Sequence, residues 1–177
     1  MKVIARTRGT RSTREATKLL IAVLTVLVVV PGLVWAGDVP DSIGTIQALL
    51  PDTASLHNKV VYVDFWASWC IPCRQSFPWM ENIYERLQSE GLEVVAISVD
   101  KDHKSALKFL DDLRVNFPIL FDSTGDLASR YNLEAMPSSF IYGRDGKLLH
   151  RIRGFTEDEK AGVEAMIVNA LRKGGSK

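Results

Sequence analysis

The sequence predicts an α/β domain in which a central mixed β-sheet is flanked by helices on both faces. Two observations predict this class. From position 60 onward, apolar β-branched runs alternate with segments of helical period, and the last part of the chain has the pattern of a hairpin followed by a helix. With 177 residues and 46% hydrophobic content, the chain can also bury a sizeable core in one domain.

The expected elements follow one another in a definite order, beginning with a short helix or irregular arm over 43–50. The periodicity then predicts strands over 60–65, 92–99 and 117–121, a hairpin of 138–142 and 148–152, and helices over 70–88, 104–113, 127–131 and about 156–173. Pro78 should kink the helix over 70–88, unless that helix ends at Phe77. Thr156 and Glu159 have the spacing of a capping box at the start of the last helix.

The chain has two cysteines, and both lie between the first predicted strand and the helix after it. Cys70 and Cys73 are three positions apart, so they share one side of a first helical turn and can form a disulfide. The unpaired N–H groups and the dipole at a helix start favour negative charge. We therefore expect Cys70 to be an exposed thiol of lowered pKa that attacks disulfides, with Cys73 as the thiol that resolves the mixed disulfide.

Other uses of a C-x-x-C pair fit the sequence less well. Covalent haem attachment needs a histidine at the next position, which is Arg74. A zinc site needs two more ligands, and the histidines at 57, 103 and 150 are isolated from one another. A purely structural disulfide would close a very short loop and stabilise the fold little. Redox chemistry is the favoured interpretation.

Two segments carry a family resemblance. The run 64–73, DFWASWCIPC, resembles the active-site segment of the thioredoxin superfamily. The run 131–141, YNLEAMPSSFI, followed by Asp145-Gly146-Lys147 and Gly154, resembles its second signature. The resemblance implies a thioredoxin fold in which Pro137 follows a cis peptide bond and faces the cysteines, with the backbone of Met136 binding an extended substrate segment.

The spacing between the two motifs narrows the resemblance. Cys73 and Pro137 are 64 positions apart, and the helix and strand predicted over about 101–121 account for the excess over a minimal thioredoxin. This α/β insertion between the C-x-x-C helix and the cis-proline strand looks like that of exported TlpA-like and ResA-like disulfide reductases. ResA-like members tend to have a glutamate three residues after the second cysteine, whereas this chain has Ser76.

Asp64 is an acid within an apolar strand, where burial should raise its pKa. The resemblance implies that Asp64 exchanges a proton with Cys73. The alternative is an acid at the strand edge that contacts solvent or a lysine. Trp69 is expected to present a partly exposed flat surface beside the thiols, together with Ile71 and Pro72, and Trp66 is expected to pack in the core.

Residues 1–36 have the layout of a targeting segment. Six basic residues precede an apolar run over 19–30, and Val34-Trp35-Ala36 supplies a cleavage site for a secretory signal peptide. An uncleaved membrane anchor is the alternative, because 19–36 approaches the length of a bilayer span. Residues 37–177 then form the thioredoxin-like domain, whose 16 basic and 20 acidic residues give a net charge of −4 and no reason to expect nucleic-acid binding.

These observations predict an exported, periplasmic or otherwise extracytoplasmic, thiol–disulfide oxidoreductase. It would reduce disulfides of envelope proteins, with apocytochrome c as one candidate, and would receive electrons from a membrane thiol transporter of the DsbD or CcdA type. The Cys70–Cys73 couple would be its redox group, with no metal and no other cofactor. The alternatives are a thiol oxidase or isomerase of the same fold, and a non-catalytic thioredoxin-like binding module.

Overall fold

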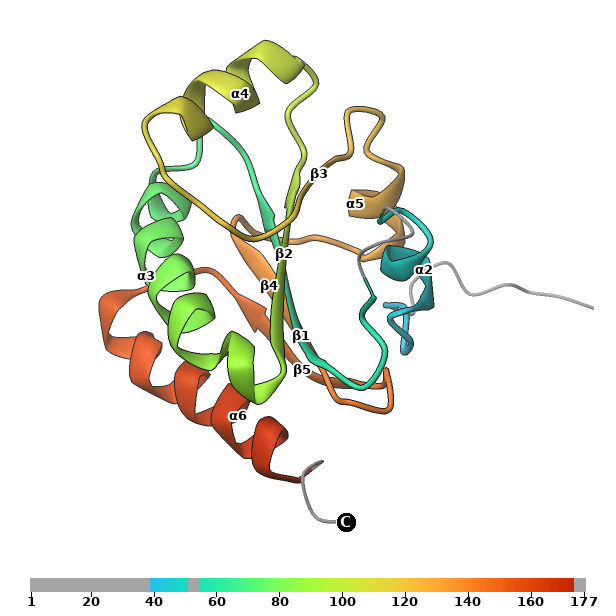
Figure 1. Ribbon diagram of the computed structural model, residues 1–177. Helices are drawn as coiled ribbons and strands as arrows, with labels where there is room; N and C mark the ends of the chain where they lie inside the picture. Colours follow the sequence, from blue (N-terminus) through green and yellow to red (C-terminus); the bar gives the residue numbers. More distant parts are fainter. Residues whose placement is uncertain (1–38, 51–54, 174–177) are drawn as a thin grey trace, which may run out of the picture. The chain divides into compact units, whose positions relative to one another are not determined.

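The computed structural model describes residues 39–50 and 55–173, and its centre is a five-stranded sheet of order β3-β2-β1-β4-β5 (Figure 1). Strand β1 (Val60–Trp66) lies in the middle, parallel to β2 (Leu92–Ser98) and antiparallel to β4 (Ser138–Tyr142). The outer strands are β3 (Ile119–Phe121), parallel to β2, and β5 (Leu148–Arg153), antiparallel to β4. The mixed sheet confirms the predicted fold class.

Helices cover both faces of this sheet. On one face lie α3 (Ile71–Leu87) and α6 (Lys160–Lys173), and on the other lie the short helices α2 (Gly44–Gln47) and α5 (Asp126–Arg130) (Figure 1). Helix α4 (His103–Asp111) connects β2 to β3. The 3-10 turns η1 (Gln88–Glu90) and η2 (Glu157–Glu159) follow α3 and precede α6.

Strand β1 sorts the core into two halves, because its side chains alternate between the two faces of the sheet. Its even-numbered apolar residues join the cluster under α3, α4 and α6, and its odd-numbered ones join the cluster under α2 and α5. All seven residues of the strand are buried. Trp66 packs in the first cluster, as predicted, and its ring lies 5.0 Å from that of Phe77 on α3 and 4.7 Å from that of Phe109 on α4. Each such buried side chain stabilises the fold by about 1.5–3 kcal/mol.

Several predicted boundaries need correction. Helix α3 continues through Pro78 to Leu87, so the alternative end at Phe77 is wrong. Strand β3 starts only at Ile119, because Phe117 is buried in the core and Pro118 has no N–H to donate to a ladder. The last helix opens with η2, where the Thr156 hydroxyl hydrogen-bonds to the Glu159 carboxylate (2.8 Å) and makes no cap to the backbone.

Helix α4 and strand β3 occupy the sequence interval where an insertion was expected. Their correspondence to the insertion of TlpA-like proteins remains a prediction. The predicted targeting segment, 1–36, lies outside the described residues. Within the described ranges, no helix combines the length and apolar character needed to cross a bilayer.

Candidate active site

The two cysteines lie where β1 passes into α3, at the carboxyl end of the central strand. Cys70 is the N-cap residue of α3, with extended backbone angles, and it forms a disulfide with Cys73 in the first turn (S–S 2.06 Å). The N–H of Cys73 donates a hydrogen bond to the sulfur of Cys70 (3.2 Å), so this sulfur occupies the position of a capping acceptor. Pro72 fits in the first turn because its missing N–H would have had no intrahelical partner.

The exposure of Cys70 is lower than predicted. Only 4% of its surface is accessible, and Cys73 has no accessible surface. Cys70 is covered because its sulfur is bonded to Cys73 and both residues belong to the apolar cluster under α3. The small accessible area that remains belongs to Cys70, and the order of attacking and resolving sulfur stays a prediction.

Two large apolar side chains project into solvent on either side of Cys70. Trp69 is 68% exposed and Ile71 is 76% exposed, the two highest values among the large hydrophobic residues described as exposed, while Pro72 is half-buried. The predicted exposure of Trp69 is confirmed. An exposed apolar pair beside a disulfide gives a partner protein a surface on which to pack.

Asp64 is fully buried in the middle of β1, so the alternative of an acid at the strand edge is wrong. The hydroxyl of Ser139 on β4 donates to its Oδ1 (2.6 Å), and the hydroxyl of Tyr62 donates to Ser139 (2.8 Å). Its Oδ2 is buried and has no hydrogen-bond partner among the residues that the structure describes. Burial raises the pKa of Asp64 from 3.8 to about 7, and the hydrogen bond from Ser139 opposes this rise.

Asp64 and Cys73 belong to the same face of the sheet. The even-numbered positions of β1, including Tyr62 and Trp66, point toward α3, and Cys73 packs in the cluster that these residues form. A carboxyl group with a pKa near neutrality is thus placed on the side of the sheet that holds the buried sulfur. Ser76, where ResA-like proteins tend to have a glutamate, is also buried there and donates its hydroxyl to the carbonyl of Cys73 (3.0 Å).

The peptide bond between Met136 and Pro137 is cis, as predicted. Pro137 is buried directly before β4, and its carbonyl accepts a hydrogen bond from Gly154 N–H (2.8 Å). Met136 is half-buried and packs against the cluster that contains both cysteines. Among the described residues, no backbone–backbone hydrogen bond uses the N–H or C=O of Met136.

The sequence analysis missed Asp100, a nearly buried carboxylate just beyond β2. It accepts hydrogen bonds from the backbone N–H and the hydroxyl of Ser68 (both 2.8 Å) and from the hydroxyl of Ser98 (3.0 Å). Asp100 therefore ties the loop that precedes Cys70 to the end of β2. The available signal was an acid directly after an apolar strand, at the same sheet edge as the cysteines.

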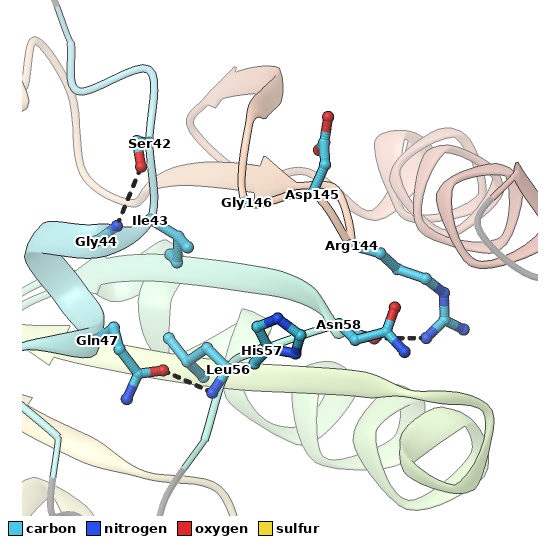
Figure 2. A pocket seen from close by; sticks show the side chains of 10 residues that line it. All are labelled: Ser42, Ile43, Gly44, Gln47, Leu56, His57, Asn58, Arg144, Asp145 and Gly146. Atoms are coloured by element: carbon cyan, nitrogen blue, oxygen red, sulfur yellow. Dashed lines mark hydrogen bonds between the residues drawn. The ribbon is translucent and has the colours of Figure 1, made fainter.

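A cavity of about 300 Å³ lies at the opposite end of β1, between α2, the segment before β1 and the β4–β5 turn (Figure 2). Arg144 from that turn donates to the carbonyls of Asn58 (2.7 Å) and Glu90 (2.6 Å), and His57 also lines the cavity. Neither cysteine reaches this space. The cavity is therefore separate from the redox pair, and its volume gives no reason to assign it a part in disulfide exchange.

The three histidines are dispersed, with His57 before β1, His103 in α4 and His150 in β5. Across residues 39–50 and 55–173, no three His, Cys, Asp or Glu side chains are grouped so that they could bind a metal ion.

Comparisons with known proteins agree with this geometry. The Redoxin family matches residues 47–167, more than half of the chain. Thiol-disulfide oxidoreductase ResA of Bacillus subtilis (strain 168) is 31% identical over 103 residues, which cover 58% of this chain and 58% of that protein. The chain thus matches just over half the length of this curated relative.

Solved structures show the same fold. A Chlorobium tepidum protein assigned as the thiol:disulfide interchange protein DsbE is 41% identical, with a TM-score of 0.64, and the match covers 66% of this chain and 82% of that one. StoA from Bacillus subtilis is 24% identical, with a TM-score of 0.52 and coverage of 60% and 84%. The second match supports the fold alone.

Proposed function

Because the chain belongs to the Redoxin family and is a ResA/TlpA-like member of the thioredoxin superfamily, we propose that it is an extracytoplasmic thiol–disulfide oxidoreductase. It reduces disulfides of envelope proteins through the Cys70–Cys73 dithiol. The observation that supports this most directly is the disulfide between Cys70 and Cys73 at the start of α3, directly after the central strand β1.

The first step is attack by Cys70 on a substrate disulfide. In the reduced protein, the Cys73 N–H that now points at Cys70 Sγ and the dipole of α3 stabilise a thiolate at Cys70. That thiolate forms a bond to one substrate sulfur, the substrate S–S bond breaks, and the other substrate sulfur leaves as a thiolate. The product is a mixed disulfide between Cys70 and the substrate.

The second step uses Cys73 and Asp64. Asp64 takes the proton of the Cys73 thiol, and the resulting thiolate attacks Cys70 Sγ. The Cys70–Cys73 bond forms, the mixed disulfide breaks, and the second substrate thiolate leaves. Two electrons have then passed from the protein dithiol to the substrate. An acid with a pKa of about 7 suits this proton transfer near neutral pH.

Substrate binding uses the surface around Cys70. Trp69, Ile71 and Pro72 provide apolar contact on the helix side. Met136, held beside the cysteine cluster by the buried Pro137, pairs through its backbone groups with an extended substrate segment. Affinity then comes mainly from main-chain hydrogen bonds and apolar packing.

The physiological setting is also part of the proposal. Apocytochrome c is a candidate substrate, because a c-type haem motif has two cysteines that must be reduced before attachment. In an oxidising compartment the dithiol needs an outside source of electrons, for which a membrane thiol transporter of the DsbD or CcdA type is the candidate. Residues 1–36 would export the domain or anchor it.

Measuring the reduction potential of Cys70–Cys73 in glutathione buffers tests the direction of transfer. A reductant is expected near the value of thioredoxin, about −270 mV, whereas a potential near −120 mV would indicate an oxidase. Single-turnover reduction of insulin by the reduced protein tests the activity itself. Protein alkylated at both cysteines is the control, and equal insulin reduction by the alkylated protein would contradict the proposal.

Replacing Asp64 by asparagine tests the second step. We expect the mixed disulfide to resolve about 10²-fold more slowly at pH 7, because the proton acceptor is lost. Stopped-flow single turnovers from pH 6 to pH 9 measure this. Unchanged rates over that range would remove Asp64 from the mechanism.

A further inference from the structure

Asp64 is the last of three buried side chains joined by hydrogen bonds, which run from Tyr62 on β1 to Ser139 on β4 and back to Asp64 on β1. Asp64 and Ser139 are direct partners in the antiparallel ladder, and Ser139 Oγ donates to Asp64 Oδ1 (2.6 Å). The hydroxyl of Tyr62, two residues before Asp64 on the same face of β1, donates to Ser139 Oγ (2.8 Å). All three side chains are buried, so solvent does not compete for these hydrogen bonds.

The direction of hydrogen-bond donation from Tyr62 through Ser139 to Asp64 follows from the protonation of the two hydroxyls. Burial, with a further contribution from the charge of Asp64, raises the pKa of Tyr62 well above its ordinary value, so its hydroxyl stays protonated and donates. A serine hydroxyl has one proton. Since Ser139 accepts from Tyr62, its own proton points at Asp64 Oδ1.

Within residues 39–50 and 55–173, no hydrogen bond or ion pair joins Asp64 to a cationic side chain. The neighbour of Asp64 on the β2 side is Ala96, which has no polar side chain. Within the described residues, the pKa of Asp64 is raised by burial and lowered by the hydrogen bond from Ser139. Ser76 on α3 donates instead to the carbonyl of Cys73. Asp64 Oδ2 is left buried with no partner in the described part of the chain.

We propose that Tyr62 and Ser139 are positioning residues that occupy Oδ1 of Asp64 and leave Oδ2 as the oxygen that takes the proton of Cys73. This rests on the proposed function. When the proton moves from Cys73 Sγ to Oδ2, the electron pair left on sulfur attacks Cys70 Sγ. Asp64 later releases the proton to solvent or to the departing substrate thiolate. The hydroxyl of Ser139 stabilises the carboxylate form of Asp64 through a charge-assisted hydrogen bond, which offsets part of the cost of burial.

Ser139→Ala is the direct test. In the oxidised protein, the carboxyl resonance of Asp64, followed by carbon-13 NMR, should titrate about one pH unit higher than in the wild type, because a hydrogen bond to the carboxylate is lost. Ser139→Thr, which keeps the hydroxyl, should restore the wild-type midpoint. Tyr62→Phe should give a smaller upward shift, since Ser139 keeps its own donor, and it serves as a second test if Ser139→Ala does not fold.

A matched control and a kinetic measurement separate this inference from the proposed function. Tyr142→Phe removes a buried tyrosine hydroxyl from the other face of β4 and should leave the Asp64 midpoint unchanged. In each variant, the pH midpoint of the rate of mixed-disulfide resolution should match the NMR midpoint of Asp64. In protein that also carries Asp64→Asn, Ser139→Ala should no longer change the pH dependence of that rate. An Asp64 midpoint that is the same in wild type, Ser139→Ala and Tyr62→Phe would overturn the inference. If the Asp64 midpoint shifts in the variants as expected but the wild-type protein does not reduce insulin, the result contradicts the proposed function and not this inference.

Discussion

Two buried hydroxyl clusters lie on opposite faces of β4, and they end differently. On the face toward α3, hydrogen bonds lead from Tyr62 through Ser139 to Asp64, whose Oδ2 has no hydrogen-bond partner within the described ranges. On the face toward α2 and α5, the hydroxyls of Tyr131 and Tyr142 lie 3.2 Å apart, and Tyr142 donates to the carbonyl of Pro40 (3.1 Å).

The second cluster has a structural role. Its hydroxyls satisfy each other and a backbone carbonyl, and the Tyr131 ring packs 4.9 Å from those of both Phe65 and Phe140. The first cluster leaves a buried polar atom unsatisfied, which a fold retains at a cost of roughly 1–3 kcal/mol. The two clusters therefore differ in one respect: the first contains a titratable carboxyl oxygen with no hydrogen-bond partner in the described part of the chain, and the second contains only hydroxyls that are hydrogen-bonded.

The largest expected effect tests whether chemistry is confined to the α3 face. Cys70→Ser should lower single-turnover insulin reduction by at least roughly 10³-fold, because the attacking sulfur is lost. Tyr142→Phe, on the other face, should retain turnover. Insulin reduction by the Cys70→Ser protein at the wild-type rate would contradict both the proposed mechanism and the assignment of chemistry to the α3 face.

The next effect concerns the cost of the unsatisfied carboxyl. Because the pKa of Asp64 is raised in the folded protein, folding takes up a proton between about pH 4 and pH 7, and stability falls as pH rises through that range. At pH 9 the contribution of this group should destabilise the oxidised protein by up to about 4 kcal/mol relative to pH 4.

Urea unfolding of oxidised wild type and Asp64→Asn measures this contribution. The wild type should lose stability between pH 4 and pH 7 relative to the variant, and the variant should be the more stable protein at pH 9. Parallel pH profiles for the two proteins would show that Asp64 titrates normally.

A smaller effect is expected where the redox loop is anchored. Asp100→Ala should destabilise the protein by about 2–3 kcal/mol, because two donors of Ser68 and one of Ser98 lose a charged acceptor. Asp111→Ala on the exposed side of α4 is the matched control, with an expected change within about 0.5 kcal/mol. Equal unfolding midpoints in urea for the two variants would contradict the anchoring role.

The smallest effect is expected in the structural cluster. Tyr142→Phe should cost about 1 kcal/mol of stability through loss of the hydrogen bond to Pro40, measured by urea unfolding at pH 7. The loss should be the same at pH 5 and pH 8, since the pKa of Tyr142 is raised by burial and does not approach neutrality. A pH-dependent loss would show that the two clusters are coupled through β4.

The sequence was sufficient for features that depend on local pattern. The two apolar runs predicted buried strands over 60–65 and 92–99, close to the observed β1 and β2, and the cysteine spacing predicted the disulfide at a helix start. Asp64 was recognised because a charged residue interrupts an otherwise apolar strand. Each of these features depends on residues that are close together in the sequence.

Features that depend on register between distant segments were not predicted. Ser139 is 75 positions from Asp64, and only the antiparallel register of β1 with β4 places them opposite each other. The contact between Asp100 and Ser68 likewise depends on the parallel pairing of β1 with β2. The burial of Cys70 follows from side chains of the surrounding cluster, which no local spacing specifies.

The margins of the sheet limit where another polypeptide can attach. Strand β3 has only three residues, and β5 carries Arg151 and Arg153, which both form ion pairs with Glu134. Short or charged outer strands resist edge-to-edge association between copies of a protein. The backbone at Met136 lies away from both margins, just before β4, so the substrate segment proposed to bind there would not use the edges that are protected against association between copies.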